Sequence, residues 1–128
     1  MSYYTTTFLK TDFETAIEQV TASLKNEGFG VLTEIRVNEV FKKKLDIDFK
    51  NYRILGACNP TFAHKAILNE DKVGVMLPCN VVVQEHADGK IEVTAVSPLA
   101  SMQAIENKEL HSIALEVEEK LKKVIESL

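Results

Sequence analysis

The sequence lacks the motifs that identify the common nucleotide-binding and hydrolytic enzymes. Its five glycines form no G-x-G-x-x-G or P-loop pattern, and no G-x-S-x-G motif is present. Glycine-rich phosphate binding and a serine nucleophile on a strand-to-helix turn are therefore not indicated. No complete set of nucleophile, base and orienting group is evident either. The sequence leaves enzymatic activity open but favours a non-enzymatic protein.

Long apolar runs are also missing. The longest are only a few residues, whereas a helix needs about 20 apolar residues to cross a bilayer. The first residues, M-S-Y-Y-T-T-T, lack the basic start and apolar region of a signal peptide. We therefore expect a cytoplasmic protein without membrane contacts. In a reducing compartment its two cysteines are expected to be free thiols, ligands or a redox pair rather than a structural disulfide.

The chain has no excess of positive charge. Its 15 basic and 19 acidic residues give a net charge of −4. Non-specific affinity for nucleic acids comes mainly from basic side chains that neutralise phosphates, so this balance argues against a DNA or RNA partner. The length of 128 residues suits one domain, residues 1–128, with one buried core.

The N-terminal part predicts a strand, a helix and a second strand. Tyr3 to Phe8 is rich in Tyr, Thr and Phe, which is typical of a strand. Thr11 and Glu14 form a capping box, and apolar residues at spacings of three and four follow it until Gly28, which can end the helix. Apolar and polar residues then alternate from Phe29 to Val37, which predicts a half-buried strand.

The middle of the chain predicts shorter elements. Asn38 can cap a helix from Glu39 to Leu45, and residues 52–57 read as a third strand. Asn59 and Pro60 are favourable as N-cap and first residue of a helix that extends to about residue 68. The segment 73–77 is expected to be extended or a loop.

The C-terminal part predicts a hairpin followed by helices. Strands at 79–85 and 91–96 flank an Asp-Gly turn, Ser97-Pro98 opens a short helix, and Asn107 caps a long one. Apolar residues form one stripe of that last helix, while Glu116/Lys120, Glu118/Lys122 and Glu119/Lys123 are spaced for ion pairs. The order β-α-β-(α)-β-α-β-β-(α)-α predicts an α+β domain. We expect a mainly antiparallel sheet of about five strands with helices packed on one face.

Both cysteines lie in similar local sequences. Cys58 and Cys79 are each followed by an asparagine, Asn59 and Asn80, and each lies close to a proline. Cys58 ends the third strand and precedes a helix N-terminus, where free N–H groups and the helix dipole favour a thiolate. If the third and fourth strands are antiparallel, the two cysteines lie at one edge of the sheet. Whether they share a face depends on the register.

Other roles for these residues remain open. Free cysteine is among the most buried residue types, so each thiol can simply belong to the core. His64 lies about one turn into the helix that follows Cys58 and could act as a base or as a third ligand. Cys58, Cys79 and His64 would then form an open or weak site for a soft metal ion such as zinc. A cysteine hydrolase built on Cys58 and His64 would lack an orienting third group.

Three segments together resemble a known family. They are F-G-V-L-T-E-I at residues 29–35, Y-R-I-L-G-A-C-N-P at residues 52–60 and L-P-C-N-V-V-V at residues 77–83. With His64, they resemble the bacterial and archaeal domain-of-unknown-function family 302, over nearly the whole chain. The resemblance implies an α+β fold similar to the TATA-binding-protein-like class and often a homodimer. It implies no activity.

The sequence is best interpreted as a cytoplasmic binding or interaction domain, expected to be homodimeric. Its candidate ligand or contact site is the edge of the sheet that carries Cys58, Asn59, Cys79 and Asn80, with His64 nearby. If this site binds a ligand, we expect a small molecule or a metal ion. The alternative is a thiol-based metal-binding or redox protein that uses Cys58, Cys79 and His64.

Overall fold

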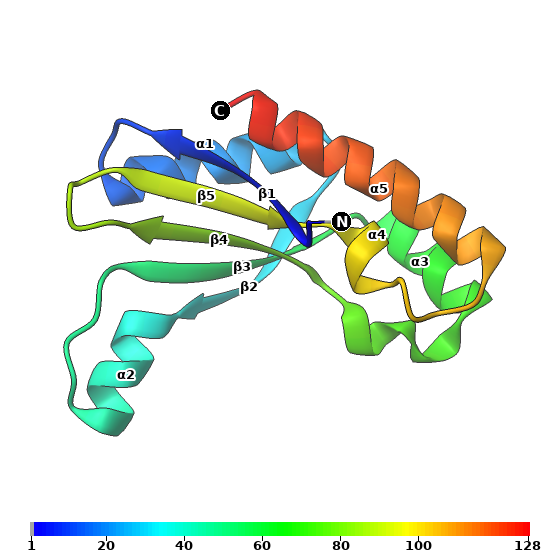
Figure 1. The fold of residues 1–128 in the computed structure, drawn as a ribbon, viewed down its shortest axis with the longest axis horizontal. Coiled ribbons are helices and arrows are strands. Elements are labelled where there is room, and N and C mark those ends of the chain that lie inside the picture. Colours follow the sequence, from blue (N-terminus) through cyan, green and yellow to red (C-terminus); the bar gives the residue numbers. More distant parts are fainter. Residues whose placement is uncertain (1) are drawn as a thin grey trace.

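The computed structural model describes residues 2–128 and shows an α+β fold (Figure 1). Met1, the first residue of the predicted domain, lies outside this range. The strands are β1 (Tyr4–Leu9), β2 (Gly30–Arg36), β3 (Tyr52–Cys58), β4 (Cys79–Glu85) and β5 (Ile91–Val96). The helices are α1 (Phe13–Asn26), α2 (Val37–Leu45), α3 (Pro60–Asn69), α4 (Pro98–Ser101), α5 (Lys108–Glu126) and the 3-10 helix η1 (Asp71–Met76). No helix in residues 2–128 is long and apolar enough to cross a membrane.

The five strands form one sheet in the order β1-β5-β4-β3-β2, and all neighbouring strands are antiparallel. Helices α1 and α5 lie along one face of this sheet (Figure 1). On the opposite face, Phe8 is 54% exposed and Ile35 is 48% exposed. The predicted antiparallel sheet with helices on one face and a long C-terminal helix is therefore confirmed.

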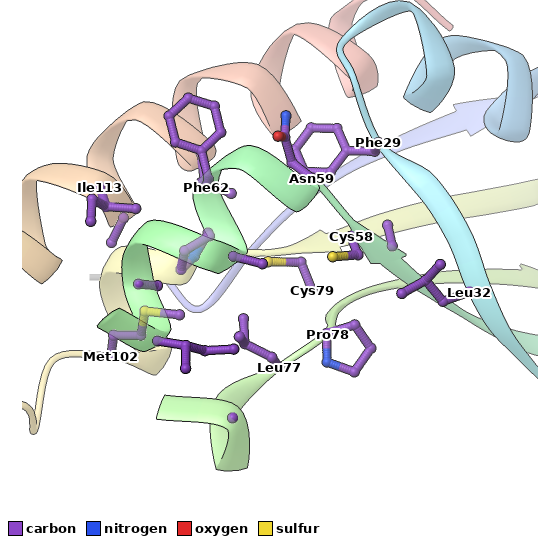
Figure 2. Close-up of a pocket in the computed structure, with 18 of the residues that line it drawn as sticks. Phe29, Leu32, Cys58, Asn59, Phe62, Leu77, Pro78, Cys79, Met102 and Ile113 are labelled. Atoms are coloured by element: carbon purple, nitrogen blue, oxygen red, sulfur yellow. The ribbon is translucent and has the colours of Figure 1, made fainter. Parts of the chain in front are cut away.

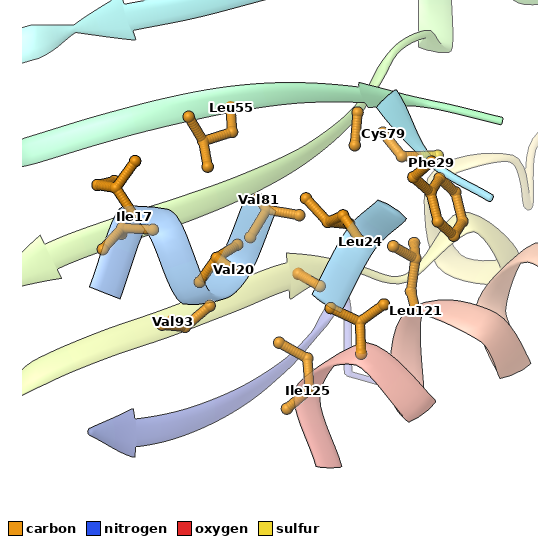
Figure 3. Packing of buried hydrophobic residues seen from close by; sticks show 14 of the residues in the cluster. Ile17, Val20, Leu24, Phe29, Leu55, Cys79, Val81, Val93, Leu121 and Ile125 are labelled. Atoms are coloured by element: carbon orange, nitrogen blue, oxygen red, sulfur yellow. The ribbon is translucent and has the colours of Figure 1, made fainter. Parts of the chain in front are cut away.

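The main core fills the layer between the covered face of the sheet and these two helices. Leu55, Val81 and Val93 point from adjacent strands towards Val20 and Leu24 of α1, and α5 closes the layer (Figure 3). These side chains are completely or almost completely buried. Burial of each such side chain stabilises the fold by about 1.5–3 kcal/mol. This layer fixes which face of each strand points inward.

A second, smaller core lies beyond the ends of the strands. It joins Ala66 of α3, Val73 of η1, Met102 after α4 and the first half of α5, where Leu110 and Ala114 are buried. The segment 73–77, expected to be extended or a loop, lies mostly in η1. The 3-10 helix η1 follows α3 and buries Val73, whose N–H group donates to the backbone carbonyl oxygen of Glu70.

The helix caps differ in part from the sequence prediction. Helix α1 is capped by Asp12 and not by Thr11, because the Asp12 carboxylate accepts the N–H of Thr15 at 2.8 Å. Helix α2 begins at Val37, so Asn38 lies inside its first turn. Its side-chain amide instead donates to Asn51 and accepts the N–H of Tyr52 at the start of β3. The caps predicted at Ser97 and Asn107 are confirmed.

Gly56 occupies a site on the uncovered face of the sheet where no side chain fits. A Cβ atom there would lie 2.0 Å from Oγ1 of Thr33 and 2.8 Å from Cγ of Pro78. Thr33 pairs with Gly56 across β2 and β3, and Pro78 immediately precedes β4. Because Gly56 has no side chain, Thr33 of β2 and Pro78 before β4 can both pack directly against β3 next to Cys58.

We predict that Gly56→Ala lowers the free energy of unfolding by about 1–3 kcal/mol, as other overpacked substitutions do. The matched control is Gly30→Ala in β2, where a Cβ would meet nothing within 4 Å and the change should stay within about 0.5 kcal/mol. Urea unfolding of both variants checks this. The double variant Gly56→Ala/Thr33→Ala should recover part of the loss. Equal stability of the Gly56→Ala and Gly30→Ala variants would contradict the packing described here.

Candidate functional site

A pocket of about 320 Å3 separates the two cores at the end of the sheet (Figure 2). Phe29, Ala57, Cys79 and Val117 of the main core line one side of it. Members of the second core and their neighbours line the other side. The remaining lining residues are Leu32, Thr33, Cys58, Asn59, Phe62, Ala63, Ala66, Ile67, Gly74, Leu77, Pro78, Pro98, Met102, Ile113 and Ala114.

The walls of this pocket are apolar and uncharged. None of the lining residues is Asp, Glu, Lys, Arg or His, and the polar groups among them are the Thr33 hydroxyl, the Asn59 amide and the two thiols. Sites for small molecules are mostly apolar with a few polar groups and have volumes of about 300–1,000 Å3. The pocket has this chemistry and lies at the lower end of this range of volumes.

Cys58 and Cys79 both line the pocket, although they begin on opposite faces of the sheet. In the antiparallel register Cys79 lies opposite Ala57, so its side chain points to the covered face. Cys58 is one residue further along β3, so its side chain points to the uncovered face. It pairs with Gly30 of the neighbouring strand β2. The strands end here, and the pocket extends around their ends to both thiols (Figure 2). The register thus shows that Cys58 and Cys79 lie on opposite faces of the sheet, which the sequence alone could not decide.

The Cys79 thiol is protonated at neutral pH. Its side chain is buried, and this burial raises its pKa to about 11, with the nearby Cys58 acting in the same direction. A protonated thiol is a poor nucleophile and a poor metal ligand. Cys79 therefore contributes an apolar, polarisable surface to the pocket at neutral pH.

The two asparagines of the predicted site lie apart. Asn59 lines the pocket and occupies the N-cap position of α3, but its side chain makes no cap hydrogen bond and instead donates to the carbonyl oxygen of Glu27 at 3.4 Å. It thereby ties α3 to the end of α1. Asn80 is exposed, pairs with Gly56 on the uncovered face and does not line the pocket.

His64 is exposed on α3 and does not line the pocket. Its neighbours Phe62, Ala63, Ala66 and Ile67 occupy the side of the helix that does. In residues 2–128 no three His, Cys, Asp or Glu residues are grouped closely enough to hold a metal ion. The three-ligand metal site predicted from Cys58, Cys79 and His64 is therefore not assembled, because the helical position of the histidine directs it to solvent.

Sequence reasoning missed the part of the pocket formed by the C-terminal third of the chain. Met102 and Ile113 line it from the segment after α4 and from α5 (Figure 2). Their spacing predicted only that they face inward, which they do. A pocket arises where inward-facing side chains fail to meet, and the pattern of one helix does not encode that gap.

The burial of Cys79 predicts a loss of stability at alkaline pH. An unfolded cysteine ionises near pH 9.0, whereas the folded Cys79 thiol keeps its proton up to about pH 11. The unfolded state therefore loses the proton first, and the free energy of unfolding falls by about 2–3 kcal/mol as pH rises through this range. Urea unfolding from pH 8 to 11 measures this. The decline should be smaller by that amount in Cys79→Ala and only slightly smaller in Cys58→Ala, because burial is the larger cause of the raised pKa and Cys58 the smaller one. Parallel curves for the wild type and Cys79→Ala would contradict the assignment.

Comparisons with known proteins agree with the fold. The family model described as "Domain of unknown function DUF302" matches residues 4–128. The crystal structure of the uncharacterized conserved protein DUF302 from Bacillus stearothermophilus is similar to this chain, with a TM-score of 0.91 and 30% sequence identity over 98% of each chain. No curated protein matches. Since the family model spans almost all of the sequence, this chain belongs to the DUF302 family.

Proposed function

We propose that the protein is a non-enzymatic binding domain that holds a small apolar ligand in the pocket at the end of β3 and β4. The observation that carries this proposal is an uncharged pocket of about 320 Å3 between two otherwise buried cores. Cys58, Asn59 and Cys79, which the sequence singled out, belong to its lining. The free thiols are in keeping with a cytoplasmic location.

The energetics of the pocket support this proposal. An enclosed empty cavity of 320 Å3 would cost about 8 kcal/mol at ~24 cal/mol per Å3, an upper limit because this pocket opens to solvent. That limit is comparable to the whole stability of a typical domain, about 5–15 kcal/mol. Water gains little against walls with few hydrogen-bonding groups. An apolar ligand would recover the missing contacts.

The pocket can be entered from solvent. Leu32 of β2 and Ile67 of α3 line it and are 68% and 45% exposed. Val75, between the lining residues Gly74 and Leu77, is 84% exposed. Apolar side chains exposed together around an apolar pocket are typical of a binding site, whereas single exposed ones need no explanation. Leu32 and Ile67 therefore open part of the pocket lining to solvent.

A thiol-based function is the second candidate. Its support is that Cys58 and Cys79 line one pocket and that Cys58 is near enough to contribute to the raised pKa of Cys79. The raised pKa of Cys79 opposes redox or soft-metal chemistry at neutral pH. His64 supplies no third ligand. Binding of an apolar ligand therefore accounts for more of the geometry.

Filling the pocket tests the ligand proposal. Ala63→Phe places an aromatic ring in the pocket and should weaken binding of the uncharged apolar dye Nile red at least about tenfold, because the volume for the dye is lost. Ala63→Leu, a smaller change, should weaken it less. Ala22→Phe, at an exposed position of α1, is the matched control and should bind like the wild type. Fluorescence titration measures the affinities, and unchanged affinity in a folded Ala63→Phe protein would refute the pocket as the site.

We also propose that the protein forms a homodimer through the uncovered face of the sheet. The register places one charged residue on this face, Glu92, whose carboxylate accepts a hydrogen bond from Thr6 and lies 2.8 Å from His86. The other residues of the face are Tyr4, Thr6, Phe8, Gly30, Thr33, Ile35, Tyr52, Ile54, Gly56, Cys58, Asn80, Val82, Gln84, Thr94 and Val96. Depletion of charge is typical of the core of a protein–protein interface.

The size of this face suits a dimer of identical chains. Five strands about 4.8 Å apart and roughly 20 Å long give a planar footprint of about 500 Å2. Side chains project from the sheet, so the accessible area of this face is larger than its planar footprint. It therefore approaches the ~800 Å2 that each partner buries in a stable interface. Two copies related by a two-fold axis would bury the same face of each chain.

Light scattering after size exclusion tests the dimer. The wild type should have twice the chain mass of 14.3 kDa at micromolar concentration. Phe8→Glu and Ile35→Glu should shift it to monomer, because each would bury an unpaired carboxylate in the interface. Leu115→Glu, at a 46% exposed position of α5, is the control and should remain dimeric. A monomeric wild type would contradict the proposal.

A further inference from the structure

We propose that the ligand of the pocket is a single-chain anionic amphiphile, such as a medium-chain carboxylate, whose head group lies between Lys65 and Lys120. This inference rests on the proposed binding function and specifies the chemical class of the ligand. The apolar walls hold the chain, and the two ammonium groups at the Phe62 end of the pocket hold the negative charge.

The two lysines converge on one wall of the pocket. The ring of Phe62 lines it, and Nζ of Lys65 lies 5.7 Å and Nζ of Lys120 lies 6.0 Å from the centre of this ring. Lys65 is on α3, three residues after Phe62, whereas Lys120 comes from α5. Helices distant in the sequence thus bring two positive charges to one aromatic ring in the wall of an uncharged pocket, although neither lysine itself lines the pocket.

Neither of these lysines is neutralised by the protein. Within residues 2–128 the ion pairs include Glu118 with Lys122 on α5 but none that involves Lys65 or Lys120. Glu116, spaced to pair with Lys120, does not. In a chain with a net charge of −4, two unpaired ammonium groups beside one aromatic ring form a local attraction for an anion.

The volume of the pocket limits the chain of the ligand. If a carbon group takes about the volume of one water molecule in the liquid, ~30 Å3, the pocket of about 320 Å3 holds roughly ten carbons. The polar groups of the lining are too few to satisfy a sugar or a nucleotide base. Decanoate and its uncharged analogue 1-decanol are therefore suitable probes.

Calorimetric titration of both probes at pH 7.5 and low salt tests the inference. The variants are Lys65→Gln/Lys120→Gln, the charge-preserving Lys65→Arg/Lys120→Arg, and the control Lys43→Gln/Lys44→Gln on the exposed face of α2. Loss of both charges should weaken decanoate about tenfold and leave decanol unchanged. The arginine variant and the control should bind both probes within about twofold of the wild type. Added salt should weaken decanoate in the wild type, the arginine variant and the control, which keep both charges, and should have little effect in the glutamine variant.

The outcomes separate this inference from the proposed function. Decanol binding without decanoate binding in the wild type overturns the anionic head group and leaves the apolar site intact. Equal loss of both probes in the glutamine variant also overturns it, because the lysines would then act only through their packing against Phe62. If the wild type binds neither probe and does not bind Nile red, the proposed function and this inference fail together.

Discussion

The packing of the sheet against α1 and α5 determines the rest of the structure. Leu55, Val81 and Val93 fill this layer, and their positions fix the register of β3, β4 and β5. A shift of one residue would turn these side chains to the other face. With this register, Cys79 lies opposite Ala57 and β3 ends at Cys58. The chain beyond the strand ends must then bury its apolar residues separately, and the pocket lies where the two cores meet.

Much of the fold could be predicted because local patterns agree with it. The Asp-Gly turn, the cap at Asn107 and the apolar stripe of α5 each indicate one structure, and the structure has all three. The differences are small and local. Asp12 replaces Thr11 as the cap of α1 because its carboxylate, one residue later, accepts the free N–H group of Thr15.

The candidate site was only half predictable. The sequence indicated the edge with Cys58 and Cys79, since two similar strand breaks in an antiparallel pair must lie close together. It did not indicate that His64 faces solvent or that α5 contributes Ile113 and Ala114 to the pocket. Those facts depend on the rotation of α3 about its axis and on the separation of two cores. Burial also keeps Cys79 protonated at neutral pH, which opposes thiol chemistry at this residue, while the sequence had left both a core role and a reactive role open for it.

The central claim is that an apolar ligand occupies the pocket between the two cores. Methyl-resolved NMR during titration with 1-decanol tests it most directly. The methyl groups of Leu77, Met102 and Ile113 line the pocket and should shift together with one saturable affinity, while those of Leu45 and Leu115, exposed elsewhere, should not. Shifts that do not saturate, or that are absent from the three lining residues, would contradict the account.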